Sequence, residues 1–530
     1  MTEESSGWVV TVSVPPPSLE NNTADADRLI NELTLVLKTD YIDIDLQLLK
    51  KVPWVLRKWD YQVRCVCFKD RDRWKLVGVK SANDSAICAG IAIDLGTTRV
   101  VLRLINLETG AAVAETAFDN PQIAIGPDVL ERIHFSDNEA NLSKINRLII
   151  DGFNENISGL CEKSDVNIQD VFLLAVSGNT SMCHLFLGLP PNHIIREPYI
   201  PVVNTFNTVL AKELGIRIND TARIFIFPNV GSYFGGDLIS GIIYSRLHCQ
   251  DDISILVDVG TNAEVVLGNK DWLVACAGAA GPALEGGVSK IGMTAMPGVI
   301  DRVVIDPEGG MFDLHTIGEL RPKGICGSGM IDMMAQLFLS GMVDIRGRFV
   351  ASRCKDRLKE SDGIRRIVLV SSKNSATGQE LSISQVDIDS LVRSKAAMYT
   401  ILETIARYVG ITFDDLSTFY IAGTFGSFIN PRSAISIGMI PDLPEETYCS
   451  LGNSSLGGAT MVLTSRKVLD EVAGIRDRIT YLELNVNQEF MNRFSAAKFL
   501  PHTDPSLFPS VKFREFGGSY LINEDDTLSP

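Results

Sequence analysis

Two short phrases in the chain place the same chemical groups directly after an apolar run. The first is Asp94-Leu-Gly96-Thr97-Thr98, and the second is Asp258-Val-Gly260-Thr261-Asn262. Glycine lets backbone N–H groups come close to a phosphate, hydroxyl groups add hydrogen bonds, and a carboxylate holds Mg²⁺, usually through water. One copy could be an ordinary turn, but two copies favour a site for Mg-ATP. We therefore expect Asp94 and Asp258 to hold the metal ion and act in catalysis, while the glycines and polar residues of both phrases bind the nucleotide.

Two glycine-rich turns could complete the nucleotide site. Gly423-Thr424-Phe-Gly426 follows an apolar strand and is the best candidate for the adenosine side. Gly324-Ile-Cys-Gly327-Ser328-Gly329 precedes a predicted helix over 330–339, and a helix N-terminus favours an anion or a ribose hydroxyl. Turns that open helices often contain glycine, so each signal alone is weak. Their position after the second Asp phrase favours a nucleotide contact.

Asp237 is the candidate for positioning the attacking nucleophile. It stands in Tyr233-Phe-Gly235-Gly236-Asp237, at the start of a predicted helix just before the second Asp phrase. ATP hydrolysis or phosphoryl transfer needs a group that orients water or accepts a proton, and a carboxylate can do both. The alternative is a plain helix N-cap, a position that aspartate favours.

The elements that must position these residues repeat along the chain. Each Asp phrase ends an apolar strand and is followed by another β-rich run, 100–105 and 265–267, which predicts two hairpins. Phe172–Gly178 and Phe419–Gly423 form a second pair of similar strands in the same order. The repetition predicts an α/β fold with two similar halves, 89–250 and 251–500. The longer second half should carry insertions near 301–320 and 346–379.

The two ends of the chain are predicted separately. Residues 1–11 read as a tail and 12–88 as a small α/β domain, with a helix over 24–37, apolar periodicity over 42–56, and paired strands at 61–68 and 74–79. Residues 501–530 are polar and contain proline, which predicts a loosely packed C-terminal tail.

Composition excludes several classes of function. The 530 residues include 65 acidic and 49 basic residues, a net charge of −16, which argues against binding to nucleic acid or to anionic lipid. No apolar run reaches about 18 residues, so we expect no membrane span, and the N-terminus has no secretory pattern. Ten cysteines without a C-x-x-C pair favour free thiols in a reducing cytoplasm.

Longer phrases make the chain resemble a known family. They are Pro15-Pro-Pro-Ser-Leu-Glu20, Asp94-Leu-Gly-Thr-Thr98, Asn120-Pro-Gln122, Ser177-Gly-Asn-Thr180, Gly235-Gly-Asp237, Asp258-Val-Gly-Thr-Asn-Ala-Glu264, Ala279-Ala-Gly-Pro282, Gly324-Ile-Cys-Gly-Ser-Gly329, Gly438-Met-Ile-Pro-Asp-Leu-Pro444 and Phe499-Leu-Pro-His502. The two Asp phrases and the Gly423 turn resemble those of the actin, heat-shock-chaperone and sugar-kinase ATPases. More narrowly, the chain resembles the ATP-dependent reductive activators of corrinoid proteins.

The resemblance implies a fold and a task. The fold would be two duplicated actin-like (ribonuclease-H-like) ATPase halves with a small N-terminal α/β domain, and Glu264 joins the nucleotide-binding candidates. The task would be to use ATP to drive the reduction of Co(II) to Co(I) in a corrinoid methyltransferase protein. The expected ligands are ATP and Mg²⁺, and the expected partner is a corrinoid-binding protein. The resemblance does not identify the methyl donor. It also leaves open whether the protein forms a homodimer, and whether ATP is hydrolysed or only bound.

The chain departs from the family pattern in its cysteines. Family members commonly carry an iron–sulfur cluster, which needs four closely spaced cysteines, but the N-terminal part has only Cys65, Cys67 and Cys88. We therefore expect no cluster. Either a separate ferredoxin-type donor supplies the electrons, or this chain does another job with the same ATPase. Cys326 with Cys276 resembles loosely the shared cluster of 2-hydroxyacyl-CoA dehydratase activators, although buried thiols are the simpler interpretation.

Three other functions remain open at this stage. The loose resemblance at Cys326 leaves open an activator of a 2-hydroxyacyl-CoA dehydratase-like enzyme. A small-molecule kinase could use the same fold, but no residue pattern names its substrate. A nucleotide-gated adaptor without catalysis is the third alternative. Both hairpin phrases keep Asp, Gly and Thr, which counts against a loss of catalysis.

Overall fold

The computed structural model describes residues 7–260, 263–278, 289–306, 310–423, 429–482, 484 and 488–512. Its contacts divide the chain into two compact units. The first unit contains Met1–Arg246 and Ser454–Ile479, and the second contains Leu247–Asn453 and Thr480–Pro530. Each unit is described by itself below.

The first unit begins with a small four-stranded sheet in the order β1-β3-β4-β2. Its strands and helices are β1 (Val9–Ser13), β2 (Ile42–Ile44), β3 (Gln62–Asp70), β4 (Arg73–Ser81), α1 (Asp25–Leu37), α2 (Leu46–Leu49) and α3 (Val52–Lys58). The predicted helix and the predicted strand pair are both present, and the two strands, β3 and β4, run antiparallel. The apolar stretch at 42–56 is not one helix, because it divides into β2 and two short helices, the second opening with Pro53 in its first turn. Trp8 is fully buried, so the packed structure begins before β1.

The larger sheet of the first unit has the order β7-β6-β5-β8-β10-β9. Its strands are β5 (Ala89–Leu95), β6 (Arg99–Asn106), β7 (Ala112–Asp119), β8 (Val171–Gly178), β9 (Val209–Leu210) and β10 (Arg223–Ile226). β5 pairs antiparallel with β6 and parallel with β8. The main helices are α4 (Val129–Phe135), α5 (Glu139–Lys163), α6 (Thr180–Leu187) and α7 (Gly236–Ser245). The buried side of β5 and β8 and the apolar stripe of α5 form one core.

The second unit repeats this arrangement. Its main sheet has the order β21-β20-β11-β12-β13-β22. The strands are β11 (Ser254–Val259), β12 (Ala263–Gly268), β13 (Leu273–Gly278), β20 (Thr418–Ala422), β21 (Tyr448–Gly452) and β22 (Ile479–Tyr481). β11 pairs antiparallel with β12 and parallel with β20, as β5 does with β6 and β8. The predicted hairpins and the duplication are therefore confirmed.

Two small sheets fill the stretches where insertions were expected. They have the orders β15-β14-β16 and β17-β18-β19. Their strands are β14 (Val299–Ile305), β15 (Phe312–Thr316), β16 (Gly324–Ile325), β17 (Leu358–Ser361), β18 (Ile364–Val370) and β19 (Leu381–Ser384). The main helices of the unit are α8 (Gly327–Leu339), α10 (Gln385–Tyr408), α12 (Pro431–Ser436) and α15 (Gln488–Ala497), and α9 (Ala351–Cys354) is a single short turn.

The segment at the start of the predicted C-terminal tail packs into the core of the second unit. Phe508 is 2% exposed and belongs to that core. The fully buried Lys395 of α10 donates from Nζ to the carbonyl oxygens of Phe499 and Pro501, the latter at 2.7 Å. These two bonds attach the chain after α15 to the middle of α10.

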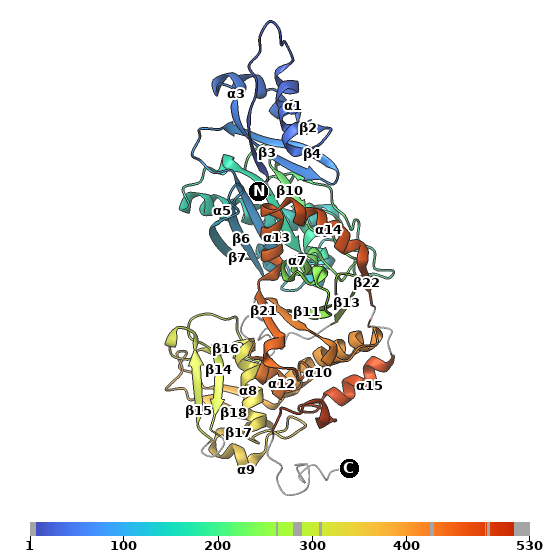
Figure 1. Cartoon of the computed structure of the whole chain (residues 1–530). Coiled ribbons are helices and arrows are strands. Elements are labelled where there is room, and N and C mark those ends of the chain that lie inside the picture. The colour runs from blue at the N-terminus through green and yellow to red at the C-terminus, as the bar shows by residue number, and fades with distance from the viewer. Residues whose placement is uncertain are drawn as a thin grey trace. The chain divides into compact units, whose positions relative to one another are not determined.

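Helices late in the chain pack on the first unit. Figure 1 shows α13 (Ser454–Thr464) and α14 (Arg466–Arg478), in orange and red, beside the green α7. A Cβ on Gly458 would lie 2.2 Å from the carbonyl oxygen of Ser240, so α13 and α7 approach more closely than any larger residue allows. The Ser240 hydroxyl donates to the Ser455 carbonyl oxygen at 2.7 Å.

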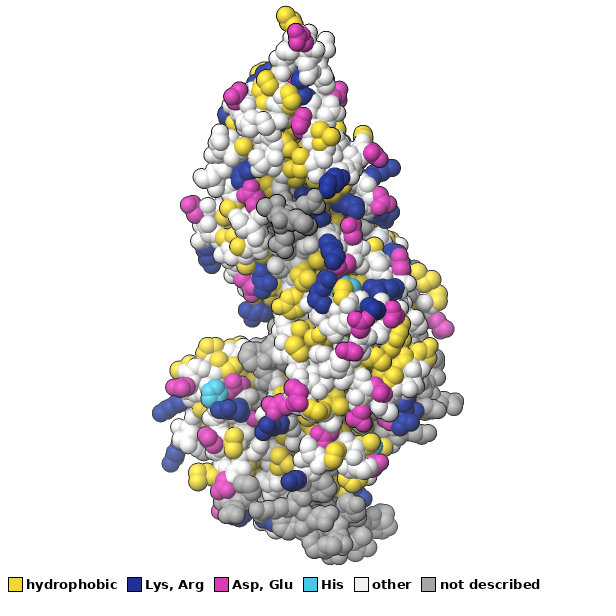
Figure 2. Space-filling view, viewed as in Figure 1, with side chains coloured by type: hydrophobic (Ala, Val, Ile, Leu, Met, Phe, Trp, Pro, Cys, Tyr) yellow, Lys and Arg dark blue, Asp and Glu magenta, His cyan; other side chains and the backbone are white. Residues whose placement is uncertain are grey.

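Charged side chains are spread over the visible face of the molecule (Figure 2). On the face in Figure 2, acidic and basic side chains occur over both units. Over the described ranges, none of the helices combines the length and the apolar character needed to cross a membrane.

Candidate functional site

The first hairpin and the strand beside it bring polar residues to one edge of the sheet. Asp94 lies opposite Ser177 in the parallel register of β5 and β8, and Leu95 lies opposite Gly178. The carboxyl ends of parallel strands meet at the same edge, where α/β proteins bind their ligands. A Cβ on Gly178 would lie 2.9 Å from the Leu95 carbonyl oxygen, so glycine permits this close pairing.

Ser455 completes this cluster from the other end of the chain. Its hydroxyl donates to Asp94 Oδ1 at 2.8 Å and lies 2.9 Å from Ser177 Oγ. Ser177 in turn donates to the carbonyl oxygen of Gly236 at 3.3 Å. Sequence reasoning missed Ser455. The available signal was a pair of serines at a helix start followed by Gly457 and Gly458, a pattern of small residues that suits close helix packing.

Asp237 lies in the first turn of α7 and is not its N-cap. The N-cap is Gly235, and Asp237 Oδ1 accepts from the Leu238 N–H at 2.9 Å. A Cβ on Gly235 would lie 2.5 Å from Asn179 Cα, so the start of α7 sits directly against the end of β8. The N-cap alternative for Asp237 is therefore wrong. Its carboxylate interacts electrostatically with Asp94, a member of the cluster at the end of β5.

Burial shifts the acidity of Asp237. Removal of the carboxyl group from water raises the pKa of Asp237 to about 6, the Leu238 N–H opposes this, and the negative charge of Asp94 adds to the rise. The side chain is half-buried, so it keeps some contact with solvent. A pKa slightly below neutral suits a group that must be ionised yet able to take up a proton.

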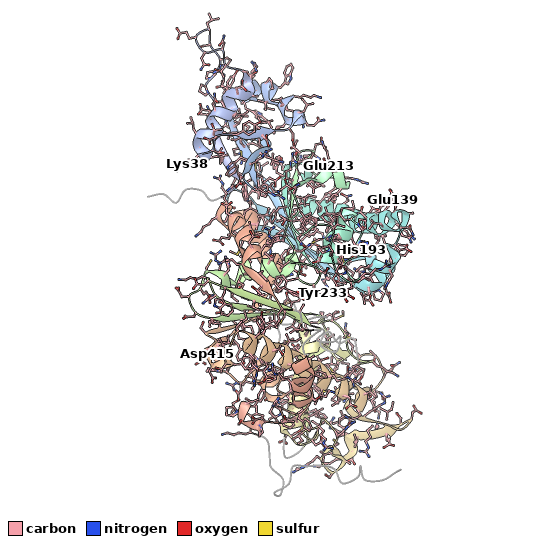
Figure 3. All side chains as sticks on the ribbon, turned by 90° about the vertical axis from the view of Figure 1, so that its right-hand side faces the viewer. Lys38, Glu139, His193, Glu213, Tyr233 and Asp415 are labelled. Atoms are coloured by element: carbon pink, nitrogen blue, oxygen red, sulfur yellow. The ribbon has the colours of Figure 1, made fainter. Side chains whose placement is uncertain are left out.

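The turn after β5 is held in one geometry. A Cβ on Gly96 would lie 2.3 Å from the Arg99 carbonyl oxygen, so only glycine fits there. Thr97 Oγ1 accepts from Asn179 Nδ2 at 3.1 Å, while Thr98 is exposed. The loop before α7 carries Tyr233, labelled in Figure 3, whose ring centroid lies 5.8 Å from that of Tyr199.

The second unit brings together three predicted residues at the end of β11. Asp258 lies opposite Glu264 of β12 and opposite Ala422 of β20. Gly423 follows with a φ of +90°, and its Cβ would lie 2.8 Å from Asp258 Oδ1, so glycine is needed for both reasons. Gly260 directly follows β11. The predicted contacts Thr261, Asn262, Thr424 and Gly426 lie outside the described residues.

Glycines just before and at the start of α8 lie close to neighbouring backbone. The helix begins at Gly327 with Cys326 as its N-cap. A Cβ on Gly329 would lie 2.5 Å from the Ile300 carbonyl oxygen, and one on Gly324 would lie 2.6 Å from that of Ile291. Ser328 is the member of the predicted set that faces a cavity.

That cavity has a volume of about 270 Å³ and is lined by residues with polar or charged side chains. The described residues that line it are Asp301, Arg302, His315, Ser328, Asp332 and Asn430. Asp332 is buried and accepts from the Val303 N–H at 2.9 Å and from the Ser433 hydroxyl. His315 Nδ1 lies 2.6 Å from Asp301 Oδ1. The cavity thus combines donors and acceptors beside the start of α8.

Comparison with known proteins identifies the family to which the chain belongs. Three family models match in order, described as the RACo linker region over 4–86, the RACo middle region over 89–250 and the C-terminal domain of RACo, the ASKHA domain, over 252–512. A solved structure of a reductive activator for corrinoid, iron–sulfur protein is 38% identical, with a TM-score of 0.87 over 96% of this chain and 82% of that one. The chain belongs to the RACo family.

Two curated relatives agree with this placement. The corrinoid activation enzyme RamQ of Eubacterium limosum is 31% identical over 76% of this chain and 69% of its own. A [Co(II) methylated amine-specific corrinoid protein] reductase of Methanosarcina barkeri is 26% identical over 76% of this chain and 75% of its own. The predicted fold, two actin-like halves with a small N-terminal domain, is confirmed by the ASKHA model and the structural match.

The cysteines of this RACo family member are mostly buried. Cys276 lies in the core on β13, where burial raises its pKa to about 12. Cys326 Sγ lies 3.3 Å from the Ile300 carbonyl oxygen and 3.1 Å from Ser328 Oγ. Cys67 and Cys88 are buried too, and burial raises the pKa of each to about 12. Iron–sulfur clusters bind thiolates, so protonated core thiols are a poor ligand set, and the expectation of no cluster stays a prediction.

Proposed function

We propose that this protein binds and hydrolyses ATP to drive the reduction of Co(II) to Co(I) in a corrinoid-binding protein of a methyltransferase system. A separate ferredoxin-type donor supplies the electron. The observation that carries the proposal is the pair of equivalent strand ends, with Asp94 near the end of β5 and Asp258 near the end of β11, in a RACo family chain. The partner class comes from the names of the two relatives, a corrinoid activation enzyme and a corrinoid protein reductase.

The residues have distinct roles in this proposal. Asp94 and Asp258 hold Mg²⁺ through water, because carboxylate oxygens suit this hard cation. The turn residues of the two phrases bind the phosphates with backbone N–H groups and hydroxyls. Glu264 supports the second turn. The nucleoside lies beside two sets of glycines, those of the 423–426 turn and those at the start of α8. Bound Mg²⁺ would neutralise phosphate charge and orient the phosphate chain.

Asp237 positions the attacking water in this proposal. The N–H of Leu238 fixes the rotation of its carboxylate, and the cluster of Asp94, Ser177 and Ser455 lies beside it. Its pKa of about 6 keeps the group ionised at neutral pH while allowing it to accept a proton. The expected signature is ATPase activity that falls as the pH drops through about 6.

ATP contributes by favouring one of two conformational states. A ligand shifts an equilibrium only by the difference in its affinity for the two states. If ATP and the Co(II) partner prefer the same state, nucleotide binding drives formation of the complex from which the electron is transferred. Hydrolysis then releases the partner, which makes the cycle directional.

The test reconstitutes the reaction. The protein, a Co(II) corrinoid protein, Mg-ATP and a low-potential donor are mixed without oxygen, and Co(I) is followed by its absorbance. We expect Co(I) only in the complete mixture, and an Asp258→Ala variant that folds but neither hydrolyses ATP nor supports reduction. Equally fast Co(I) formation without ATP, or without this protein, would contradict the proposal, and a kinase on the same fold would then be the better hypothesis.

A further inference from the structure

Asn120 hydrogen-bonds to the turn after β5. It lies just after β7, in a segment with no role in the proposed site, and is fully buried. Its Nδ2 donates to the Gly96 carbonyl oxygen at 2.9 Å, and its backbone N–H donates to the Thr98 carbonyl oxygen at 2.8 Å. One buried residue therefore fixes two carbonyl groups of a three-residue turn.

These bonds also determine where an N–H group points. A trans peptide unit is planar, and its C=O and N–H groups point in opposite directions. Because the Gly96 carbonyl points toward Asn120, the N–H of Thr97 in the same peptide unit points away from it. Asn120 thereby sets the direction of one backbone donor.

Asn179 orients the side chain of the same threonine. Its Nδ2 donates to Thr97 Oγ1 at 3.1 Å, so the threonine hydroxyl acts as an acceptor in this contact. A hydroxyl has one hydrogen to donate besides its acceptor lone pairs. The hydrogen of Thr97 is then directed to an acceptor other than Asn179.

Each asparagine is itself held in a defined orientation. Asn120 Oδ1 accepts from the Gln122 N–H at 3.0 Å, and Asn179 Oδ1 accepts from the Met182 N–H at 2.9 Å at the start of α6. Because each oxygen faces a backbone donor, each amide nitrogen must face the turn.

We propose that Asn120 and Asn179 are positioning residues that direct the backbone N–H and the hydroxyl of Thr97 to a phosphate oxygen of the nucleotide. The inference rests on the proposed function, in which the turn after β5 binds phosphate. It also gives a role to one asparagine in each of the phrases Asn120-Pro-Gln122 and Ser177-Gly-Asn-Thr180. Neither asparagine touches the phosphate, and both act through Thr97.

The test measures affinity for ATP and for adenosine, which lacks phosphates. Asn179→Ser keeps an oxygen that can cap α6 and adds no charge, but it removes the donor to Thr97. We expect ATP to bind about tenfold more weakly, the effect of one hydrogen bond to a charged group, while adenosine affinity and the melting temperature stay the same. Thr97→Val should lose as much, and the double variant should lose no more than either single one.

Two further variants sharpen the outcome. Asn120→Ser removes the donor to Gly96 and should also weaken ATP more than adenosine. Asn167→Ser changes an exposed cap in the same unit, whose Oδ1 accepts from the Gln169 N–H, and should change neither affinity. Equal losses for ATP and adenosine, or additive losses in the double variant, would overturn the inference. Unchanged ATP binding in Asn179→Ser would contradict this inference alone, whereas no ATP binding by the unmodified protein would contradict the proposed function as well.

Discussion

At the scale of single residues, burial of the ionised Asp237 carboxylate lowers the stability of the folded protein, while the same group has a proposed role in catalysis. Its pKa in the folded protein, about 6, lies above the ordinary value of 3.8. The folded state therefore binds more protons than the unfolded state between these two pH values, and stability falls as the pH rises through that window. Above about pH 6 the full cost of the buried charge is present.

Replacing Asp237 with Asn should expose this cost. An amide cannot ionise but can still accept from the Leu238 N–H, so we expect the folded protein to gain about 1–2 kcal/mol at pH 7.5 and almost nothing at pH 4. ATPase activity should fall by at least about a hundredfold. Urea denaturation at the two pH values and an ATPase assay measure both effects. A stability gain that is equal at both pH values would contradict the assigned pKa.

Ser455 and Ser454 give a matched pair of substitutions at neighbouring buried positions. Ser455 donates to Asp94, whereas the buried hydroxyl of Ser454 has no hydrogen-bond partner among the described residues. Ser455→Ala should remove about 1.5–3 kcal/mol of interaction with a charged acceptor and lower ATPase activity about tenfold or more. Ser454→Ala should leave activity unchanged and not lower the melting temperature. Equal activities in the two variants would show that the contact with Asp94 has no role in turnover.

At the scale of elements, the packing of α13 on α7 holds the cluster together. Both helices begin at the cluster, and their contact depends on the absence of a side chain at Gly458. The glycine is thus required by the neighbouring helix and not by a turn. A methyl group there must move the start of one helix, and with it Ser455 or Asp237.

Gly458→Ala tests this packing against a control in the next helix. A Cβ at Gly458 would lie 2.2 Å from backbone, while a Cβ at Gly474 of α14 would meet nothing within 4 Å. We expect Gly458→Ala to destabilise the protein by about 1–3 kcal/mol through overpacking. Gly474→Ala should stabilise it by about 0.5–1 kcal/mol, because alanine favours a helix interior. Thermal denaturation of both variants decides the matter, and equal melting temperatures would contradict the tight contact.

At the scale of the whole molecule, the cysteines bear on the source of electrons. All ten are free thiols, eight of them buried. We expect the protein purified without oxygen to contain no stoichiometric iron or sulfide, and reduction of the corrinoid to require an added donor. Iron and sulfide analysis checks this directly. About four irons per two chains would instead support a shared cluster and direct attention to Cys276 and Cys326.

The proposed partner and the nucleotide should influence each other equally. Thermodynamic linkage requires that, if ATP tightens binding of the Co(II) partner by a given factor, the partner tightens ATP binding by the same factor. A coupling of 1–3 kcal/mol, about 5- to 150-fold, is typical of such systems. Calorimetric titrations of each ligand with and without the other measure both factors. Measurable coupling in neither direction would contradict the use of ATP to bias complex formation.

The sequence alone determined the local features of this protein. An apolar run followed by Asp-x-Gly-Thr is encoded in a few contiguous residues, and its repetition was enough to predict both hairpins and the duplication of the fold. The helix at Asp25–Leu37 followed from its apolar periodicity. The resemblance carried by longer phrases placed the chain in its family, since these phrases occur in order along most of its length.

Only the tertiary structure decided which distant residues meet. Ser455 and Asp94 are 361 residues apart, and their hydrogen bond depends on α13 packing in the first unit although β21, just before it, lies in the second. The same is true of the close packing of Gly324 and Gly329, because a Cβ on either would lie within 2.6 Å of a backbone carbonyl oxygen from another segment, Ile291 or Ile300. Contacts of this kind arise from the packing of whole elements, and a pattern confined to one stretch of chain does not contain them.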